Sequence, residues 1–122
     1  MAFTDELESN IRAVYHAILK KKRPAGISGK TLHCDSFRKI AEEIKSVIRD
    51  GQSSGLKVLE ITNNIIFTIL NAHFFVYENN EMAALIGYIY LKRQGVAINY
   101  YSIGNINNGS TLEEISIVTA SW

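Results

Sequence analysis

The feature that most constrains the fold is an amphipathic repeat between residues 37 and 48. Apolar side chains recur there at spacings of three and four, which places them on one face of an α-helix. We expect this helix to begin at Asp35 or Ser36 and to be broken by the run from Asp50 to Gly55, which contains two glycines. The apolar residues of the repeat are Phe37, Ile40, Ala41, Ile44, Val47 and Ile48.

The N-terminal segment predicts a second helix, over about residues 4 to 21. Thr4 can cap its start, and the two acidic residues that follow suit the positive end of a helix dipole. The cations from Lys20 to Arg23 suit its C-terminus, and Pro24 cannot comfortably continue it. The apolar face consists of Leu7, Ile11, Val14, Tyr15 and Ile18.

Two more helices are expected on either side of an aromatic loop that begins at His73. The segment 56–71 is apolar with few charges, so we expect a helix that is hydrophobic nearly all round and central to the fold. Its β-branched residues leave a strand open, but its length favours a helix. The following helix carries Ala83 to Tyr90 as a buried face and ends at Gly95.

The C-terminal part of the chain contains fewer signals of secondary structure. Residues 96–101 form a β-prone segment, residues 104–109 are rich in turn formers, and a last short helix is expected over about residues 111 to 118. The sequence therefore predicts an all-α fold, a small helical bundle with a central buried helix and a short β segment near 96–101. One domain over residues 1–122 is expected, because 122 residues with 47% hydrophobic content suffice for one core.

Composition excludes several functional classes. A formal net charge of +1 is too balanced for a broad nucleic-acid or membrane footprint, so neither partner is expected. The single cysteine, Cys34, cannot form an internal disulfide, and His33 beside it has no second pair for a zinc site. The acidic N-terminus does not resemble a secretory signal, and no apolar run could cross a membrane. We therefore expect a cytoplasmic protein.

The His73 loop is the local arrangement that most suggests chemistry. A histidine just before a helix N-terminus could act as a general base beside unpaired amides that can hold phosphate. Taken alone, His73 is more often an ordinary core or surface residue, and Asn79 and Asn80 more often cap a helix than bind an anion. Both interpretations stay open at this point.

The stretch from Leu59 to Ile98 resembles the central part of the Doc (death-on-curing) branch of the Fic family. That family joins an apolar helix to a loop of the form His-x-Phe-x-Asp/Asn-Ala/Gly-Asn-Lys-Arg and then to a helix that ends in Leu-x-x-x-Gly. Here the loop is His-Phe-Phe-Val-Tyr-Glu-Asn-Asn-Glu from residue 73, and Leu91 to Gly95 matches the helix end. The resemblance implies a small all-helical Doc/Fic-like domain.

The resemblance also implies roles for individual residues. His73 matches the general base that takes a proton from a protein hydroxyl, and Phe75 would anchor the loop in the core. The acidic residue that holds magnesium is replaced by Tyr77, which leaves Glu78 as a weak metal candidate. Asn79 and Asn80 are the anion-binding candidates, but Asn80 and Glu81 stand where the family has its phosphate-binding Lys-Arg pair.

Three functions follow as hypotheses. The favoured one is a pseudoenzyme or protein-interaction module, toxin-like or effector-like, that engages a target protein or an antitoxin-like peptide. The second is a divergent Fic-type transferase, an adenylyltransferase or kinase, that would use ATP and magnesium. The third is a structural helical bundle, and a homo-oligomer is compatible with each. The resemblance implies the cytoplasm of a bacterium or delivery into a host cell.

Three other motifs give weaker indications of function. The cations at residues 20–23 are more often a solvated helix end than a phosphate site. The Gly-Lys-Thr at residues 29–31 lacks the first glycine and the preceding strand of a P-loop, so we reject that interpretation. Four tyrosines at 88, 90, 100 and 101 more often divide between core and rim than form a stacking surface.

Overall fold

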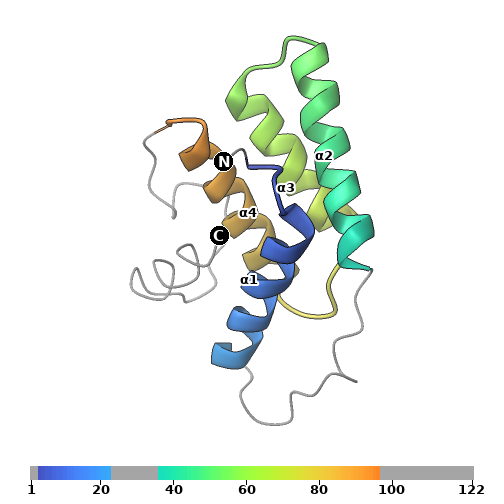
Figure 1. Cartoon of the computed structure of the whole chain (residues 1–122), viewed down its shortest axis with the longest axis vertical. Coiled ribbons are helices and arrows are strands. Elements are labelled where there is room, and N and C mark those ends of the chain that lie inside the picture. Colours follow the sequence, from blue (N-terminus) through green and yellow to red (C-terminus); the bar gives the residue numbers. More distant parts are fainter. Residues whose placement is uncertain (1–2, 23–35, 97–122) are drawn as a thin grey trace.

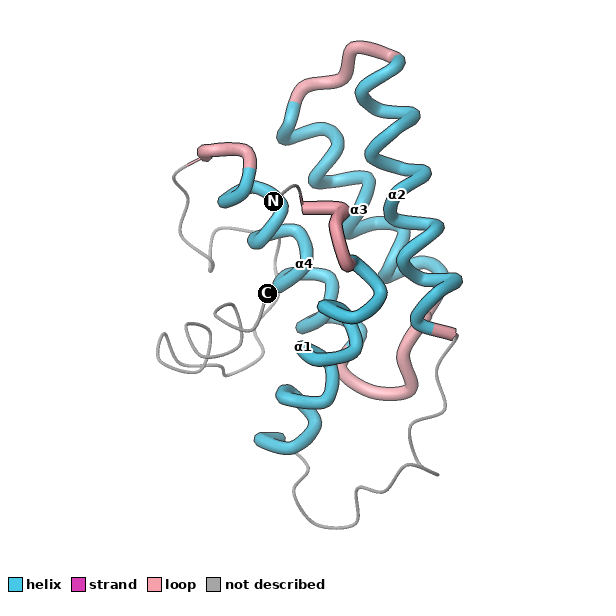
Figure 2. Tube along the Cα trace, in the orientation of Figure 1, coloured by secondary structure: helices cyan, strands magenta, loops and turns pink. Residues whose placement is uncertain are grey.

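Four helices make up the part of the chain that the computed structural model describes, residues 3–22 and 36–96. Over these residues the predicted all-α fold is confirmed. Two of the helices, α2 and α3, run antiparallel, and α3 packs in turn against α4 (Figure 1). The short connections α2–α3 and α3–α4 lie at opposite ends of α3 (Figure 2). The helices are α1 (Leu7–Lys22), α2 (Phe37–Ser53), α3 (Val58–Ala72) and α4 (Asn79–Arg93).

Capping explains where α2 begins and ends. The hydroxyl oxygen of Ser36 accepts a hydrogen bond from the backbone N–H of Lys39 at 3.2 Å, which confirms the predicted start. At the other end, Gly55 adopts a left-handed φ of +72° and the Leu56 N–H donates to the Gly51 carbonyl at 2.9 Å. This is a Schellman motif, which satisfies carbonyls that the helix end would otherwise leave unpaired.

The helix ends within the expected run from Asp50 to Gly55, but it continues into that run through Gly51 to Ser53. Gly51 is buried against α3, where a Cβ would come within 2.6 Å of the Ile61 Cγ1 atom. This glycine therefore serves close helix packing, and the stop comes from Gly55. The same arrangement ends α4, where Gly95 has a φ of +81° as predicted.

The start of α1 lies one turn later than predicted. Thr4 does not begin the helix; Glu6 takes a left-handed φ of 55°, and the helix starts at Leu7. The predicted apolar face is nevertheless the one that is buried, with Ile11, Val14 and Tyr15 fully covered.

The central buried helix is α4 rather than α3. Between Glu81 and Leu91 only Tyr88 is partly exposed, whereas α3 leaves Leu59 55% and Phe67 67% exposed. The expectation that residues 56–71 form the central helix is therefore wrong. The reason is that α3 packs through one side only, and its opposite side faces solvent. The buried residues of α3 are Ile61, Thr62, Ile65 and Ile69.

Several predicted elements lie outside the described residues. These are the loop at 24–34 with Cys34, residues 97–101 of the β segment predicted over 96–101, and the helix over 111–118. Within the described ranges, no helix combines the length and apolarity that a membrane span requires.

Gly87 lets α3 and α4 approach closely. A Cβ at this position would lie 2.8 Å from both Cγ1 and Cδ1 of Ile66. Since Cγ1 is close to the backbone, a rotation of the terminal methyl group alone cannot relieve this contact. We expect Gly87→Ala to destabilise the fold by up to about 2 kcal/mol, the balance of about 1–3 kcal/mol for overpacking and about 1 kcal/mol of gained helix propensity. Urea denaturation measures the difference.

The control is to make the same substitution in the Ile66→Ala variant, in which the opposing side chain is removed. There Gly87→Ala should become neutral or stabilising, because only the helix propensity remains. An equal loss of stability in both backgrounds would contradict close α3–α4 contact at Gly87.

Candidate functional site

The loop between α3 and α4 begins and ends in strained backbone. His73 terminates α3 with a φ of 51°, and Glu78 precedes α4 with a φ of 60°, both in the left-handed region. Non-glycine residues there cost about 1–2 kcal/mol each, so the loop holds this shape only because other contacts fix it.

The first of these contacts comes from α1. The Phe75 side chain is buried, with its ring centroid 4.6 Å from that of Tyr15. The Tyr15 hydroxyl oxygen accepts a hydrogen bond from the Tyr77 backbone N–H at 3.2 Å. One tyrosine therefore packs against the loop and also binds its backbone. The burial of Phe75 agrees with the anchoring role that the resemblance assigns to it.

The second contact is a pair of hydrogen bonds from Asn79. Its Oδ1 accepts from the Phe75 N–H at 3.0 Å, and its Nδ2 donates to the Phe75 carbonyl at 2.6 Å. The side-chain amide thus satisfies both backbone groups of a buried loop residue, which could not be left unpaired without a cost. In this arrangement the Oδ1 and one N–H of the amide hold the loop, and one N–H of Nδ2 is left for any other acceptor.

The remaining loop candidates differ in exposure. The His73 side chain is exposed and makes no hydrogen bond or ion pair within residues 3–22 and 36–96. Asn80 is exposed and Glu78 is half-buried. Glu81, by contrast, is only 3% exposed, in the first turn of α4. The histidine is therefore accessible, whereas Glu81 lies in the interior.

Neither asparagine caps α4, so that expectation is wrong. The N-cap position belongs to Glu78, whose side chain makes no capping hydrogen bond. Asn79 and Asn80 are the first two residues of the helix. The physical reason is that the Asn79 amide turns back to Phe75 and holds the loop from inside the first turn.

A metal centre is not assembled in the described part of the chain. No group of three or more His, Cys, Asp or Glu side chains comes together there. Glu78, the weak metal candidate, thus lacks the additional protein ligands of a closed site. A magnesium ion at Glu78 would need its other ligands from water and from a phosphate.

Two residues of this site were not assigned to it from the sequence. Phe74 is buried beside Phe75, and Tyr15 reaches the loop from sixty residues away in the chain. Tyr15 lies on the predicted apolar face of the first helix, and a buried tyrosine usually finds a hydrogen-bond partner. The sequence therefore indicates a hydrogen bond of the Tyr15 hydroxyl group, but it does not identify the partner.

Comparisons of the chain with protein-family models, with curated proteins and with solved structures gave no match. The function is therefore argued from the residues of this chain.

Asn79→Ala removes both bonds to Phe75 and leaves the backbone of a buried residue unpaired. We expect a loss of about 2–3 kcal/mol in the free energy of unfolding, since an unsatisfied buried group costs about 1–3 kcal/mol. Chemical denaturation measures it.

The control is Asn80→Ala, one residue later at an exposed position of the same helix turn. It should change stability by less than about 0.5 kcal/mol, as surface substitutions usually do. Equal effects of the two substitutions would show that the Asn79 amide does not hold the loop.

Proposed function

We propose that the chain is a protein-interaction module on a Doc/Fic-like scaffold, a pseudoenzyme in the sense that its loop no longer supports nucleotide transfer. The observation that carries the proposal is the double hydrogen bond of Asn79. At the position where the resemblance expects an anion-binding amide, both polar atoms of the side chain are used to hold Phe75.

Charge supports the same conclusion. A triphosphate needs cations or a metal ion that neutralise charge at the reacting group. At the start of α4 the chain has neutral, exposed Asn80 and a buried Glu81, and the basic residues of this helix, Lys92 and Arg93, lie in its last turn. Since a helix N-terminus alone contributes only partial charges, binding of a nucleotide by this loop would be weak.

Exposed apolar side chains supply a surface for a protein partner. Leu59 and Phe67 lie two turns apart on α3, and Val76 is 39% exposed in the loop. Phe67 also lines a hollow of about 270 Å³ together with Lys39 and Glu43 of α2. Large apolar side chains beside charged ones are typical of protein contact surfaces. A target protein or an antitoxin-like peptide is the partner that the proposal implies.

A divergent transferase is the second candidate, and one observation favours it. His73 is exposed in a strained left-handed conformation beside the start of α4. Strained residues cluster at functional sites, and an accessible imidazole can act as a base toward a protein hydroxyl.

Isothermal titration of the full chain with ATP, with and without magnesium, separates these candidates. We expect no binding heat up to millimolar nucleotide, because no cation of the loop neutralises the phosphates. The double variant Tyr77→Asp with Asn80→Lys restores two of the charged groups of the family motif and should gain magnesium-dependent binding. Magnesium-dependent binding by the unaltered chain that is lost in Glu78→Ala would instead establish the transferase.

Partner capture tests the interaction surface. Affinity enrichment with Phe67→Ser should lose a partner that both the unaltered chain and His73→Ala retain, because the contact is apolar and does not use the imidazole. Asn64→Ser, an exposed position on the same helix, is the matched control and should retain it. Loss of the partner in His73→Ala but not in Phe67→Ser would place recognition at the histidine and contradict the proposed surface.

A further inference from the structure

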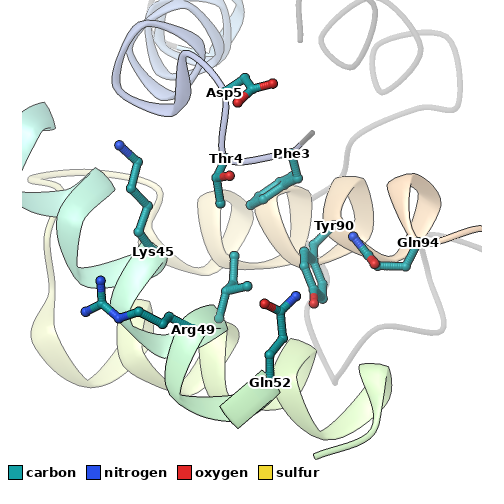
Figure 3. A pocket seen from close by; sticks show the side chains of 9 residues that line it. Phe3, Thr4, Asp5, Lys45, Arg49, Gln52, Tyr90 and Gln94 are labelled. Atoms are coloured by element: carbon teal, nitrogen blue, oxygen red, sulfur yellow. The ribbon is translucent and has the colours of Figure 1, made fainter. Parts of the chain in front are cut away.

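A second cavity lies away from the loop, at the opposite end of α4. It is an open hollow with a volume of about 580 Å³, lined by the residues that precede α1, by α2 and by the last turns of α4 (Figure 3). This volume lies within the range of about 300–1,000 Å³ that small-molecule sites occupy. Phe3, Ile48 and the ring of Tyr90 give it apolar walls.

Tyr90 is the residue that indicates a ligand. The side chain is only 2% exposed, and its ring packs edge-on against Phe3 with centroids 5.2 Å apart. It lines the cavity, yet its hydroxyl makes no hydrogen bond within residues 3–22 and 36–96. The hydroxyl oxygen is not one of the fully enclosed unpaired atoms, so it is accessible where the residue lines the cavity and suits a hydrogen bond to a molecule there.

Burial also favours the protonated form of the Tyr90 hydroxyl group. The removal of Tyr90 from water raises the pKa of its phenol above the ordinary value of 10.0. The group therefore stays neutral at physiological pH and keeps its proton available for donation.

Cations occupy one end of the cavity. Lys45 and Arg49 are one turn apart on α2 and project at that end, while Tyr90 and two glutamine amides lie at the other end (Figure 3). The Arg49 guanidinium makes no ion pair within the described residues, and Lys45 has only an exposed contact with Glu42 at 3.6 Å. Among the lining residues that the structure describes, Asp5 is the only acid, so the two cations and this anion give these residues a net charge of +1.

We propose that this cavity binds a small organic anion, a carboxylate or a phosphate monoester with a flat apolar body and a polar group at its far end. Lys45 and Arg49 bind the acidic group, because a guanidinium matches the oxygens of a carboxylate or phosphate. Phe3 and Ile48 cover the apolar body. The Tyr90 hydroxyl binds the far polar group together with the amides of Gln52 and Gln94.

This site is independent of the proposed function. Tyr90 follows Asn79 by eleven residues, which is about 16 Å along a helix, so the cavity shares no residue with the loop. Failure of one proposal therefore leaves the other untouched.

NMR titration of the ¹⁵N-labelled full chain tests the proposal with 4-hydroxybenzoate as the carboxylate and 4-nitrophenyl phosphate as the phosphate. Neutral 4-hydroxybenzyl alcohol controls for the apolar body alone. At least one anion should shift the side-chain amide resonances of Gln52 and Gln94 in a saturable manner, and the probe that binds more tightly identifies the acidic group. The alcohol should bind about tenfold more weakly or not at all, because it lacks the charge-assisted hydrogen bonds.

Three variants assign the binding to the cavity. Arg49→Gln and Tyr90→Phe should each weaken the anion by about tenfold, the effect of one lost hydrogen bond to a charged or buried group. Arg38→Gln, an exposed cation of the same helix outside the cavity, should leave affinity unchanged. Circular dichroism confirms that each variant is folded. The proposal is overturned if neither anion binds, if the alcohol binds as tightly as the anions, or if Arg38→Gln weakens binding as much as Arg49→Gln.

Discussion

The arrangement of the described helices depends on how the backbone of Phe75 is held. Asn79 pairs with both of its backbone groups, and the Tyr15 ring packs on its side chain while the Tyr15 hydroxyl accepts the Tyr77 N–H. These contacts join α1, the loop and the first turn of α4 at one point. They also offset the cost of the two left-handed residues, His73 and Glu78, that the sharp connection requires.

The same contacts decide what the loop can do chemically. The Asn79 amide uses its Oδ1 and one N–H of Nδ2 to satisfy the backbone of Phe75, so at most one N–H of this side chain is left for an anion. The loop therefore has an exposed His73, a buried Phe75 and an Asn79 that serves its structure. The exposed His73 and the apolar side chains on α3 remain accessible to a partner. The cavity around Tyr90 lies at the other end of α4, so the buried helix separates two surfaces with different chemistry.

Much of the fold could be predicted from the sequence, because periodicity indicates a helix and a few residues mark its ends. Ser36 and Gly95 were predicted at helix ends and lie there. Within the run from Asp50 to Gly55 the sequence could not separate the two glycines, because a glycine that stops a helix and one that lets helices approach have the same local signature; only the contact with Ile61 separates them. The sequence also could not decide which apolar helix is central, since Leu59 and Phe67 are apolar yet exposed. The candidate site was predictable as a loop with a buried Phe75, but Tyr15 and the pairing of Asn79 depend on distant or backbone contacts that periodicity does not encode.

Hydrogen exchange of the Phe75 and Tyr77 amides, followed by NMR with and without magnesium ATP, tests the central claim most directly. Both amides belong to a loop, yet both donate hydrogen bonds to side chains. The account predicts that they exchange as slowly as amides inside the helices and that saturating magnesium ATP leaves their rates unchanged. Fast exchange in the free protein, or strong protection that appears only with magnesium ATP, would show that the loop is organised by nucleotide and would contradict the account.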